Sequence, residues 1–406
     1  MNTPQTRTEP TAATVTRHLV LGDISRQYQV LGGNTPTLVV ELAPEPGGTL
    51  LATAHLRPED TVATSVLVLD GDGGRPVQAP ADPAAPVWAG LGPGPALTAL
   101  GRDDLAALAP LMLLRTHGSG AERLTEVMMC SRVRSVGVLF VRVARFPHAA
   151  VTDPSDLVRE ALGYSSRLAD SVVFEGSAFT VLEPEIEIEQ KVNLLDEVSI
   201  WTLAQAMCEA AEQGRYPGFF LDPGYELTRW QYGQETFEVL APREHAGYFG
   251  FTKMPDGRYL MKIKTFEQDA LRRGEKFRLN LDIPGDDLDA FLAREYPELS
   301  FHRLPPLVRA RFDVNLESAA TGHLFSIEID DVTVAGGHKL RQAEVEYLKT
   351  RVHEGIDHAL LDTELERLTG FVEEHLKDLG VRAERSLLSK LTFLRECERR
   401  GAGADS

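Results

Sequence analysis

The chain has 406 residues, of which 43% are hydrophobic and 25% are charged, and its formal net charge is −18 at pH 7. This length exceeds that of one ordinary hydrophobic core, so we expect two domains, each with enough apolar residues to fold. The negative charge argues against a general affinity for nucleic acid or anionic membranes, because both would be repelled over most of the surface. A local basic pocket could still bind phosphate.

The cysteines and the N-terminus indicate a cytoplasmic protein. The only cysteines are Cys130, Cys208 and Cys397, without Cys-x-x-Cys or His-rich spacing, so we expect neither a disulfide framework nor a zinc site. Residues Met1 to Thr16 are polar and lack the apolar region of a signal peptide, and no segment has the apolar length of a membrane span. We interpret the first residues as a frayed leader.

Residues 1–175 are predicted to form a smaller, β-rich α+β domain in which no motif indicates a role. Short alternating segments predict strands over Leu38 to Leu42 and Ala63 to Leu69. The stretch from Gly71 to Pro95 is dense in Gly, Pro, Ala and Asp, which predicts a surface loop or linker. The other elements predicted here are a leucine-spaced helix over Asp103 to Leu114, a β-branched strand over Ser135 to Phe146 and a helix over Leu157 to Leu168.

Residues 176–406 are predicted to form the second domain. An acidic strand opens it, and an apolar stripe predicts a helix over Asp196 to Gln213. Two helices close the chain, over His353 to Leu379 and Ala383 to Arg399, with Gly380 as the C-cap between them. The strands predicted in between are Tyr225 to Tyr232, Thr236 to Leu240, Tyr248 to Lys253, Tyr259 to Phe266, Lys276 to Leu281, Val308 to Val314, Leu324 to Val334 and Leu340 to Leu348.

The most informative pattern is the run Glu-Ile-Glu-Ile-Glu-Gln-Lys that starts at Glu185. At the period of a strand, Glu185, Glu187, Glu189 and Lys191 share one face, and the isoleucines lie on the other. Carboxylates in one file repel one another unless cations lie between them, whereas isoleucines suit an apolar layer. We therefore predict a strand whose polar side lines a metal-binding cavity.

Several later strands also carry charged residues at every second position of an otherwise apolar segment. The sets that share a face are Lys262 with Lys264, Arg309 with Arg311, Ser326 with Glu328 and Asp330, and Gln342 with Glu344 and Glu346. An antiparallel sheet closed into a barrel would gather these faces into one polar interior. Because carboxylates bind Mg²⁺ or Mn²⁺ and paired Arg or Lys residues bind phosphate oxygens, we expect a polyphosphate with its metal ions as the ligand.

The run Glu187-Ile-Glu189-Gln-Lys191 resembles the Glu-x-Glu-x-Lys signature of the CYTH superfamily, the triphosphate tunnel metalloenzymes. The resemblance covers roughly residues 180 to 400. Where the family has an Arg-x-Arg strand, this chain has Phe251-Thr-Lys253, so only Lys253 could serve. The other segments that resemble the family, in its order, are the lysine strand at Lys264, Arg273-Gly-Glu275, Arg309-x-Arg311, Phe325 to Asp330, Glu344-Val-Glu346 and Ser389-Lys390.

The resemblance implies an α+β fold, with a closed antiparallel β-barrel and flanking helices, and a metal-dependent triphosphate hydrolase. Its substrate would be inorganic triphosphate, thiamine triphosphate or a nucleoside triphosphate, and bound metal and basic residues would neutralise the phosphoryl oxygens. The implied catalytic residues are Glu187, Glu189, Lys191, Asp330 and Lys390. The implied ligands of Mg²⁺ or Mn²⁺ are Glu187, Glu189, Asp330, Glu344 and Glu346. The implied phosphate-binding residues are Lys253, Lys262, Lys264, Arg273, Arg309 and Arg311.

Other interpretations stay open. Taken one at a time, the acidic strand and the basic pairs are also typical of the solvated face of a sheet. The superfamily includes class IV adenylyl cyclases, which make cyclic AMP and pyrophosphate. A third alternative is a non-catalytic module that binds polyphosphate or nucleotide, with the first domain as effector. We also consider a homodimer, and the high usage of Ala, Gly, Pro and Arg suggests a GC-rich bacterial source.

Overall fold

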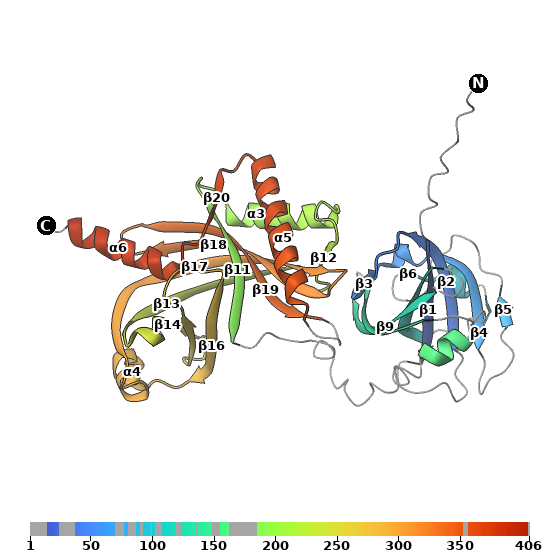
Figure 1. Cartoon of the computed structure of the whole chain (residues 1–406), viewed down its shortest axis with the longest axis horizontal. Coiled ribbons are helices and arrows are strands. Elements are labelled where there is room, and N and C mark those ends of the chain that lie inside the picture. Colours follow the sequence, from blue (N-terminus) through green and yellow to red (C-terminus); the bar gives the residue numbers. More distant parts are fainter. Residues whose placement is uncertain are drawn as a thin grey trace, which may run out of the picture. The chain divides into compact units, whose positions relative to one another are not determined.

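The computed structural model describes residues 14–23, 37–69, 77–79, 87–89, 92–98, 100–101, 108–118, 123–134, 137–147, 155–161, 185–351 and 356–404. The chain divides into two compact units. Unit 1 comprises Met1–Val181 with the short segments Ala319–Gly322 and Thr350–Ile356, and unit 2 comprises Leu182–Ser318, His323–Lys349 and Asp357–Ser406. In Figure 1, the strands of unit 1 are blue to blue-green, and those of unit 2 run from green to red.

Unit 1 is built on one sheet with the strand order β3-β10-β9-β8-β1-β2-β4-β5. Its strands are β1 Thr14–Asp23, β2 Thr37–Pro46, β3 Thr53–Leu56, β4 Ala63–Leu69, β5 Val77–Ala79, β8 Leu108–His117, β9 Leu124–Arg134 and β10 Gly137–Pro147. The smaller elements are the 3-10 helix η2 Pro58–Asp60, the strand pair β6 Trp88–Ala89 and β7 Gly92–Pro93, the helix α1 Pro95–Thr98 and a helical segment over residues 155–161.

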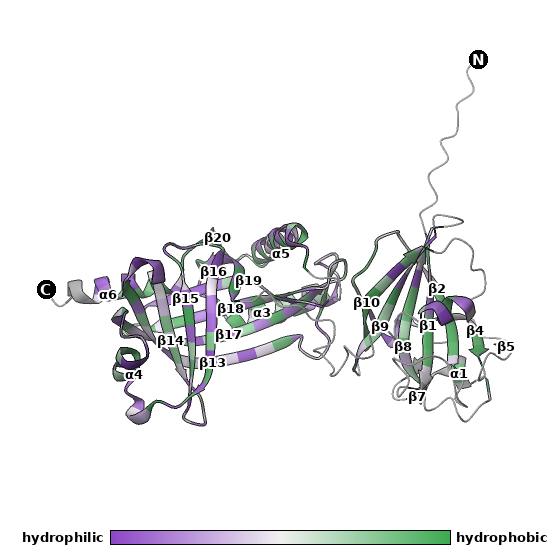
Figure 2. Ribbon diagram, turned by 60° about the horizontal axis from the view of Figure 1, so that its bottom comes forward, coloured by the Kyte–Doolittle hydropathy of each residue, from purple (hydrophilic) through white to green (hydrophobic). Residues whose placement is uncertain are grey.

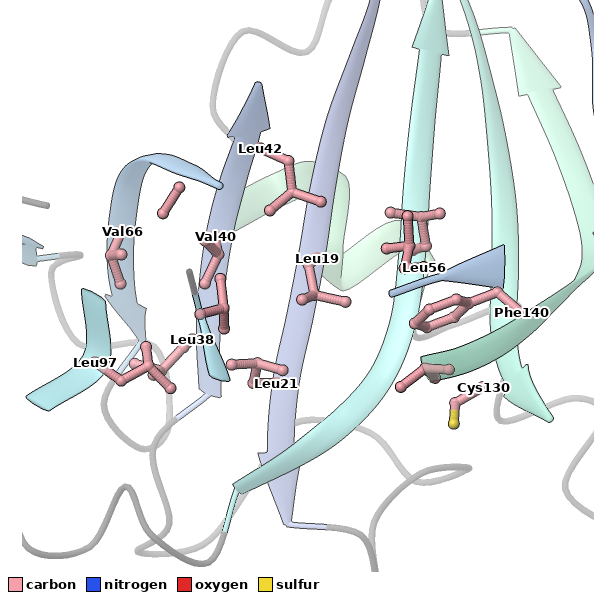
Figure 3. Packing of buried hydrophobic residues seen from close by; sticks show 14 of the residues in the cluster. Leu19, Leu21, Leu38, Val40, Leu42, Leu56, Val66, Leu97, Cys130 and Phe140 are labelled. Carbon is pink, nitrogen blue, oxygen red and sulfur yellow. The ribbon is translucent and has the colours of Figure 1, made fainter. Parts of the chain in front are cut away.

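Both faces of this sheet are buried. Leu19 and Leu38 pack on one face (Figure 3), whereas Val20 and Met112 pack on the other. This burial explains why the helix predicted from Asp103 to Leu114 is wrong over residues 108–114, which belong to β8. When both faces of a strand are covered, consecutive apolar residues all point into a core, and their leucine spacing mimics that of a helix. Residues 102–107 of that prediction lie outside the described residues.

The remaining predictions for unit 1 fall on described elements in part. The strands predicted at 38–42 and 63–69 lie within β2 and β4, and the strand predicted at 135–146 overlaps β10. The helix predicted over 157–168 is present up to residue 161, and the rest of it lies outside the described residues. The stretch predicted as a loop contains the short strands β5, β6 and β7.

Unit 2 is a closed antiparallel β-barrel. Its ring runs β17-β13-β14-β15-β16-β11-β19-β18, and β17 pairs with β18 to close it. The ring strands are β11 Ile186–Leu194, β13 Leu227–Ala241, β14 Gly247–Lys253, β15 Tyr259–Thr265, β16 Arg272–Leu281, β17 Ser300–Ser318, β18 His323–Val334 and β19 Lys339–Thr350. Two further strands, β12 Phe219–Leu221 and β20 Ala383–Ser386, pair with β17 and β11. The predicted fold class, a closed barrel with flanking helices preceded in the chain by a β-rich domain, is confirmed.

Helices pack on the outside and at one end of the barrel. They are α3 Ile200–Glu212, α4 Leu288–Glu295, α5 His358–Asp378 and α6 Lys390–Ala404, with the 3-10 helices η6 Arg243–His245 and η7 Pro284–Asp286. Phe291 of α4 packs against Phe249 and Phe251, whose side chains point away from the interior. At one end, Leu391 of α6 joins Tyr248 in an apolar cluster. Because Tyr248 pairs with Lys264, it shares the interior face, so this cluster closes that end.

Two predictions for unit 2 differ from the structure, and one helix was not predicted. The strands predicted at 225–232 and 236–240 form one strand, β13, with a register shift between Gln234 and Thr236. The helix predicted from Ala383 begins only at Lys390, because residues up to Ser386 pair with β11 as β20. Helix α4 was not predicted, and it lies between the strands predicted at 276–281 and 308–314. Within the described part of the chain, no helix is both long and apolar enough to cross a membrane.

Candidate active site

The predicted alternation of β11 is present, and its charged face points into the barrel. Glu187, Glu189 and Lys191 are all buried, as is Ile188 on the opposite face. The strand therefore separates an apolar outer layer from a charged interior. Glu185 does not belong to the charged set, because it precedes β11, has a positive φ and forms an exposed ion pair with Lys276. Figure 2 shows hydrophilic segments along several barrel strands, whereas the strands of unit 1 are mainly hydrophobic.

One ionic network surrounds Glu187. The Lys264 ammonium donates to Glu187 Oε2 at 2.6 Å, and an Arg273 guanidinium nitrogen lies 3.3 Å from the same oxygen. Arg273 also forms an ion pair with Glu189. On β16, Glu275 binds Lys262 at 2.6 Å. The predicted phosphate-binding residues of β15 and β16 are thus held by carboxylates in the barrel interior.

A second network gathers cations around Asp330 and Glu344. Arg309 Nε and Arg311 Nε donate to Asp330 Oδ1 at 2.8 and 2.9 Å. Both guanidinium groups also reach Glu344, at 3.2 and 3.1 Å. Lys390, at the start of α6, lies 2.8 Å from Glu344 and 3.1 Å from Asp330. Strands distant in sequence therefore place a compact set of cations on two shared carboxylates.

Lys191 of β11 joins the two networks. Its ammonium lies 2.9 Å from Glu189 and 3.0 Å from Glu344. This position explains the residue order in β11, since a lysine two residues after Glu189 faces the same interior.

Lys253 does not belong to the site, and its predicted role in phosphate binding is wrong. Its side chain is 49% exposed and forms an ion pair with Asp286 of η7 at 2.5 Å. The reason is the alternation of side chains along β14, which places even-numbered and odd-numbered residues on opposite faces. Tyr248 pairs with Lys264 and Gly250 pairs with Lys262, so even-numbered residues of β14 face the interior and Lys253 faces away.

The predicted metal ligands separate into two groups. One carboxylate oxygen from each of Glu187, Glu189 and Glu346 lies within 4.8 Å of the others. Asp330 and Glu344 instead bind the arginines and Lys390. Within the described part of the chain, Glu346 forms no hydrogen bond or ion pair. A half-buried carboxylate without a counterion, beside two others, suits a hard divalent cation with oxygen ligands.

The electrostatics differ between these two groups. Burial, with the Glu328 and Glu187 carboxylates, raises the pKa of Glu346 well above its usual range. Burial alone would also raise the pKa of Glu344, but Lys191, Lys390 and Arg309 hold it well below that range. Lys262 and Lys264 only partly offset this effect at Glu346, whereas the cations around Glu344 outweigh it. A bound cation near Glu346 would supply the additional positive charge that stabilises its carboxylate.

Several interior residues were outside the predicted site. Glu275 binds Lys262, Glu328 forms an ion pair with Arg311, and Tyr232 accepts a hydrogen bond from Arg309 at 3.0 Å. Burial raises the pKa of Asp313 to about 6, although Trp230 Nε1 donates to its carboxylate at 2.5 Å. Residues two apart on a strand share a face, so this rule could have identified Glu275 and Asp313, which follow the predicted site residues Arg273 and Arg311 by two positions.

Comparisons with known proteins assign no family. No protein-family model and no curated protein matches the chain. A match to HpAC1 from Hippeastrum, a proposed adenylyl cyclase described as having a dominant triphosphatase activity, has 16% identity, covers 52% of this chain and 95% of that chain, and has a TM-score of 0.31. The S. pombe RNA triphosphatase Pct1 matches with 13% identity over 57% of this chain and 90% of its own, at a TM-score of 0.22. The di-domain ARO/CYC StfQ of the steffimycin biosynthetic pathway matches with 11% identity over 82% and 90%, at a TM-score of 0.18. These similarities are too weak to indicate a function.

Proposed function

We propose that unit 2 binds a triphosphate together with Mg²⁺ or Mn²⁺ inside the barrel and hydrolyses a phosphoanhydride bond. The observation that supports this most is the convergence of carboxylates and cations from β11, β15 to β19 and α6 on one closed interior. An interior of this kind offers partners both for a polyanion and for the metal ion that accompanies it.

Glu187, Glu189 and Glu346 would hold the metal, which when bound neutralises phosphoryl charge and lowers the pKa of a coordinated water. The chain's own cations bind and orient the substrate. Arg309 and Arg311 present planar guanidinium groups that match pairs of phosphate oxygens. Charge stabilisation by such fixed donors is strong where the donors are buried, as Arg309 is.

The ion pairs of the barrel interior also fit this role. Arg309, Arg311 and Lys390 share Asp330 and Glu344, so the carboxylates hold the cations in place before phosphate arrives. Phosphate oxygens would then replace part of these contacts without moving the strands. Preorganised donors of this kind lose little free energy to reorganisation.

The proposal is tested with purified full-length protein and a panel of tripolyphosphate, ATP, GTP and thiamine triphosphate, each with Mg²⁺ or Mn²⁺. We expect metal-dependent release of orthophosphate, and at least a ~100-fold loss of kcat in Glu187→Gln. The matched control is Glu185→Gln, from the turn before β11, which should retain activity. Chromatography of the ATP products separates hydrolysis from cyclisation to cyclic AMP and pyrophosphate. No turnover of any substrate, or equal rates for the two variants, would contradict the proposal.

A further inference from the structure

Two aromatic side chains lie exposed at the end of the barrel that α6 does not close. Trp230 on β13 pairs with Arg311 of β17, so its ring shares the face of that guanidinium. Phe277 on β16 pairs with Lys262 of β15, and the Lys262 ammonium lies 5.2 Å from the centre of the Phe277 ring. Each aromatic side chain is therefore next to a cation that the proposed function assigns to phosphate binding.

Exposure along these strands shows that this end is accessible. Trp230 is 54% exposed and Phe277 is 52% exposed, whereas Arg309 and Lys264, deeper on the same faces, are buried. Leu279, which follows Phe277 on its face, is 61% exposed. Inorganic triphosphate would make no use of these apolar side chains, whereas a ligand with a planar ring can stack on them.

The Trp230 ring is oriented by one polar contact. Its indole N–H donates to Asp313 Oδ2 at 2.5 Å, and Thr228 Oγ1 donates to the same oxygen at 3.2 Å. Asp313 is buried, so this contact anchors the edge of the ring at the barrel rim. Within the described part of the chain, no other aromatic ring stacks on Trp230.

We propose that Trp230, with Phe277, binds the base of a nucleoside triphosphate whose phosphates occupy the barrel interior. This inference rests on the proposed function and adds its substrate class. A planar base fits because it stacks on an exposed aromatic ring while its triphosphate reaches Arg311 and Lys262, the cations beside these rings. The opposite end cannot hold the base, because α6 and Tyr248 fill it with an apolar cluster.

The experiment compares kcat/KM for ATP, GTP, thiamine triphosphate and tripolyphosphate in wild type, Trp230→Ala and Trp230→Phe. Loss of one base-stacking contact should lower kcat/KM for ATP or GTP about 10-fold in Trp230→Ala. Tripolyphosphate should change less than about twofold, and Trp230→Phe should retain most of the activity. The matched control is Trp201→Ala, which removes a half-exposed tryptophan of α3 outside the barrel, packed 5.2 Å from Phe312.

A calorimetric titration with the β,γ-imido analogue of ATP, and separately with tripolyphosphate, measures binding without relying on turnover. Weaker binding of the analogue alone in Trp230→Ala supports the inference, even if the hydrolysis assay fails. Equal binding of the analogue by Trp230→Ala and Trp201→Ala overturns the inference and leaves triphosphate hydrolysis standing. A wild-type preference for tripolyphosphate over both nucleotides also overturns the inference. So does a loss of activity in Trp230→Ala that is confined to thiamine triphosphate, because the Trp230 ring would then bind thiamine and not a nucleotide base.

Discussion

The Lys390 ammonium lies 2.8 Å from Glu344 Oε1, so the first residue of the last helix completes the charged interior of the barrel. Helix α6 therefore does more than close one end. Its apolar residues, such as Leu391, fix the helix against the barrel, and its first residue adds a cation beside Arg309. The C-terminal segment should be as important for the site as the strands.

Lys390→Ala should lower kcat/KM for tripolyphosphate about 10- to 100-fold, because a charge-assisted hydrogen bond contributes about 1.5–3 kcal/mol. Glu344 keeps Lys191 and Arg309 as partners, so the variant should still fold. Steady-state kinetics and circular dichroism measure the two effects. Lys377→Ala, an exposed lysine of α5, is the control, and equal kinetics for the two variants would contradict the role of Lys390.

Glu346→Gln should weaken Mn²⁺ binding at least ~10-fold, because it removes one of the three neighbouring carboxylates. Electron paramagnetic resonance of free Mn²⁺ during a titration measures this directly and needs no substrate. Glu185→Gln should bind Mn²⁺ as the wild type does. Unchanged affinity in Glu346→Gln would place the metal elsewhere.

The alternation of side chains between the two faces of a strand explains how much of the site could be predicted from the sequence. Glu187 and Glu189 alternate with apolar residues, so period two alone predicts that they share one face of the strand. That this face is the interior depends on closure of the sheet into a barrel. Lys253 shows where this reasoning fails. It was chosen by resemblance, whereas the parity of β14 puts Tyr248 and Gly250 inside and Lys253 outside.

The pairing between strands could not be predicted in the same way. That Arg309 reaches Asp330 and Glu344 depends on the closure of β17 on β18, a contact between segments whose partners no local pattern specifies. The helix predicted over 103–114 failed for a related reason. Burial of both sheet faces is a tertiary property, and it removes the alternation by which a strand is recognised.

Gly247→Ala should destabilise the protein by about 3 kcal/mol. Gly247 has φ +141°, and an added Cβ would lie 1.9 Å from the backbone oxygen of Lys264, which cannot move without disturbing β15. Urea denaturation measures the free energy of unfolding. Gly370→Ala is the control, because this helical position of α5 has open space around it and should gain about 0.5–1 kcal/mol. Equal stability of the two variants would contradict this packing.

His375 should make the protein less stable in mild acid. Burial lowers the pKa of His375 below its ordinary 6.5, and Arg215 lowers it further, while Asp378 opposes this. The stabilisation is therefore present above pH 6.5 and is lost as pH falls through the lower folded-state pKa. The melting temperature of His375→Phe should depend less on pH between about pH 7 and 5 than that of the wild type or of the exposed control His245→Gln. A pH dependence equal to that of the control would contradict this.

The central claim is that metal and triphosphate share the barrel interior. Crystals grown with Mn²⁺ and tripolyphosphate test it most directly, because the anomalous scattering of manganese locates the ion. We predict a manganese peak among Glu187, Glu189 and Glu346, with phosphate oxygens on Arg309 and Arg311. Manganese or phosphate bound only on the outer surface, with the interior ion pairs unchanged, would contradict the account.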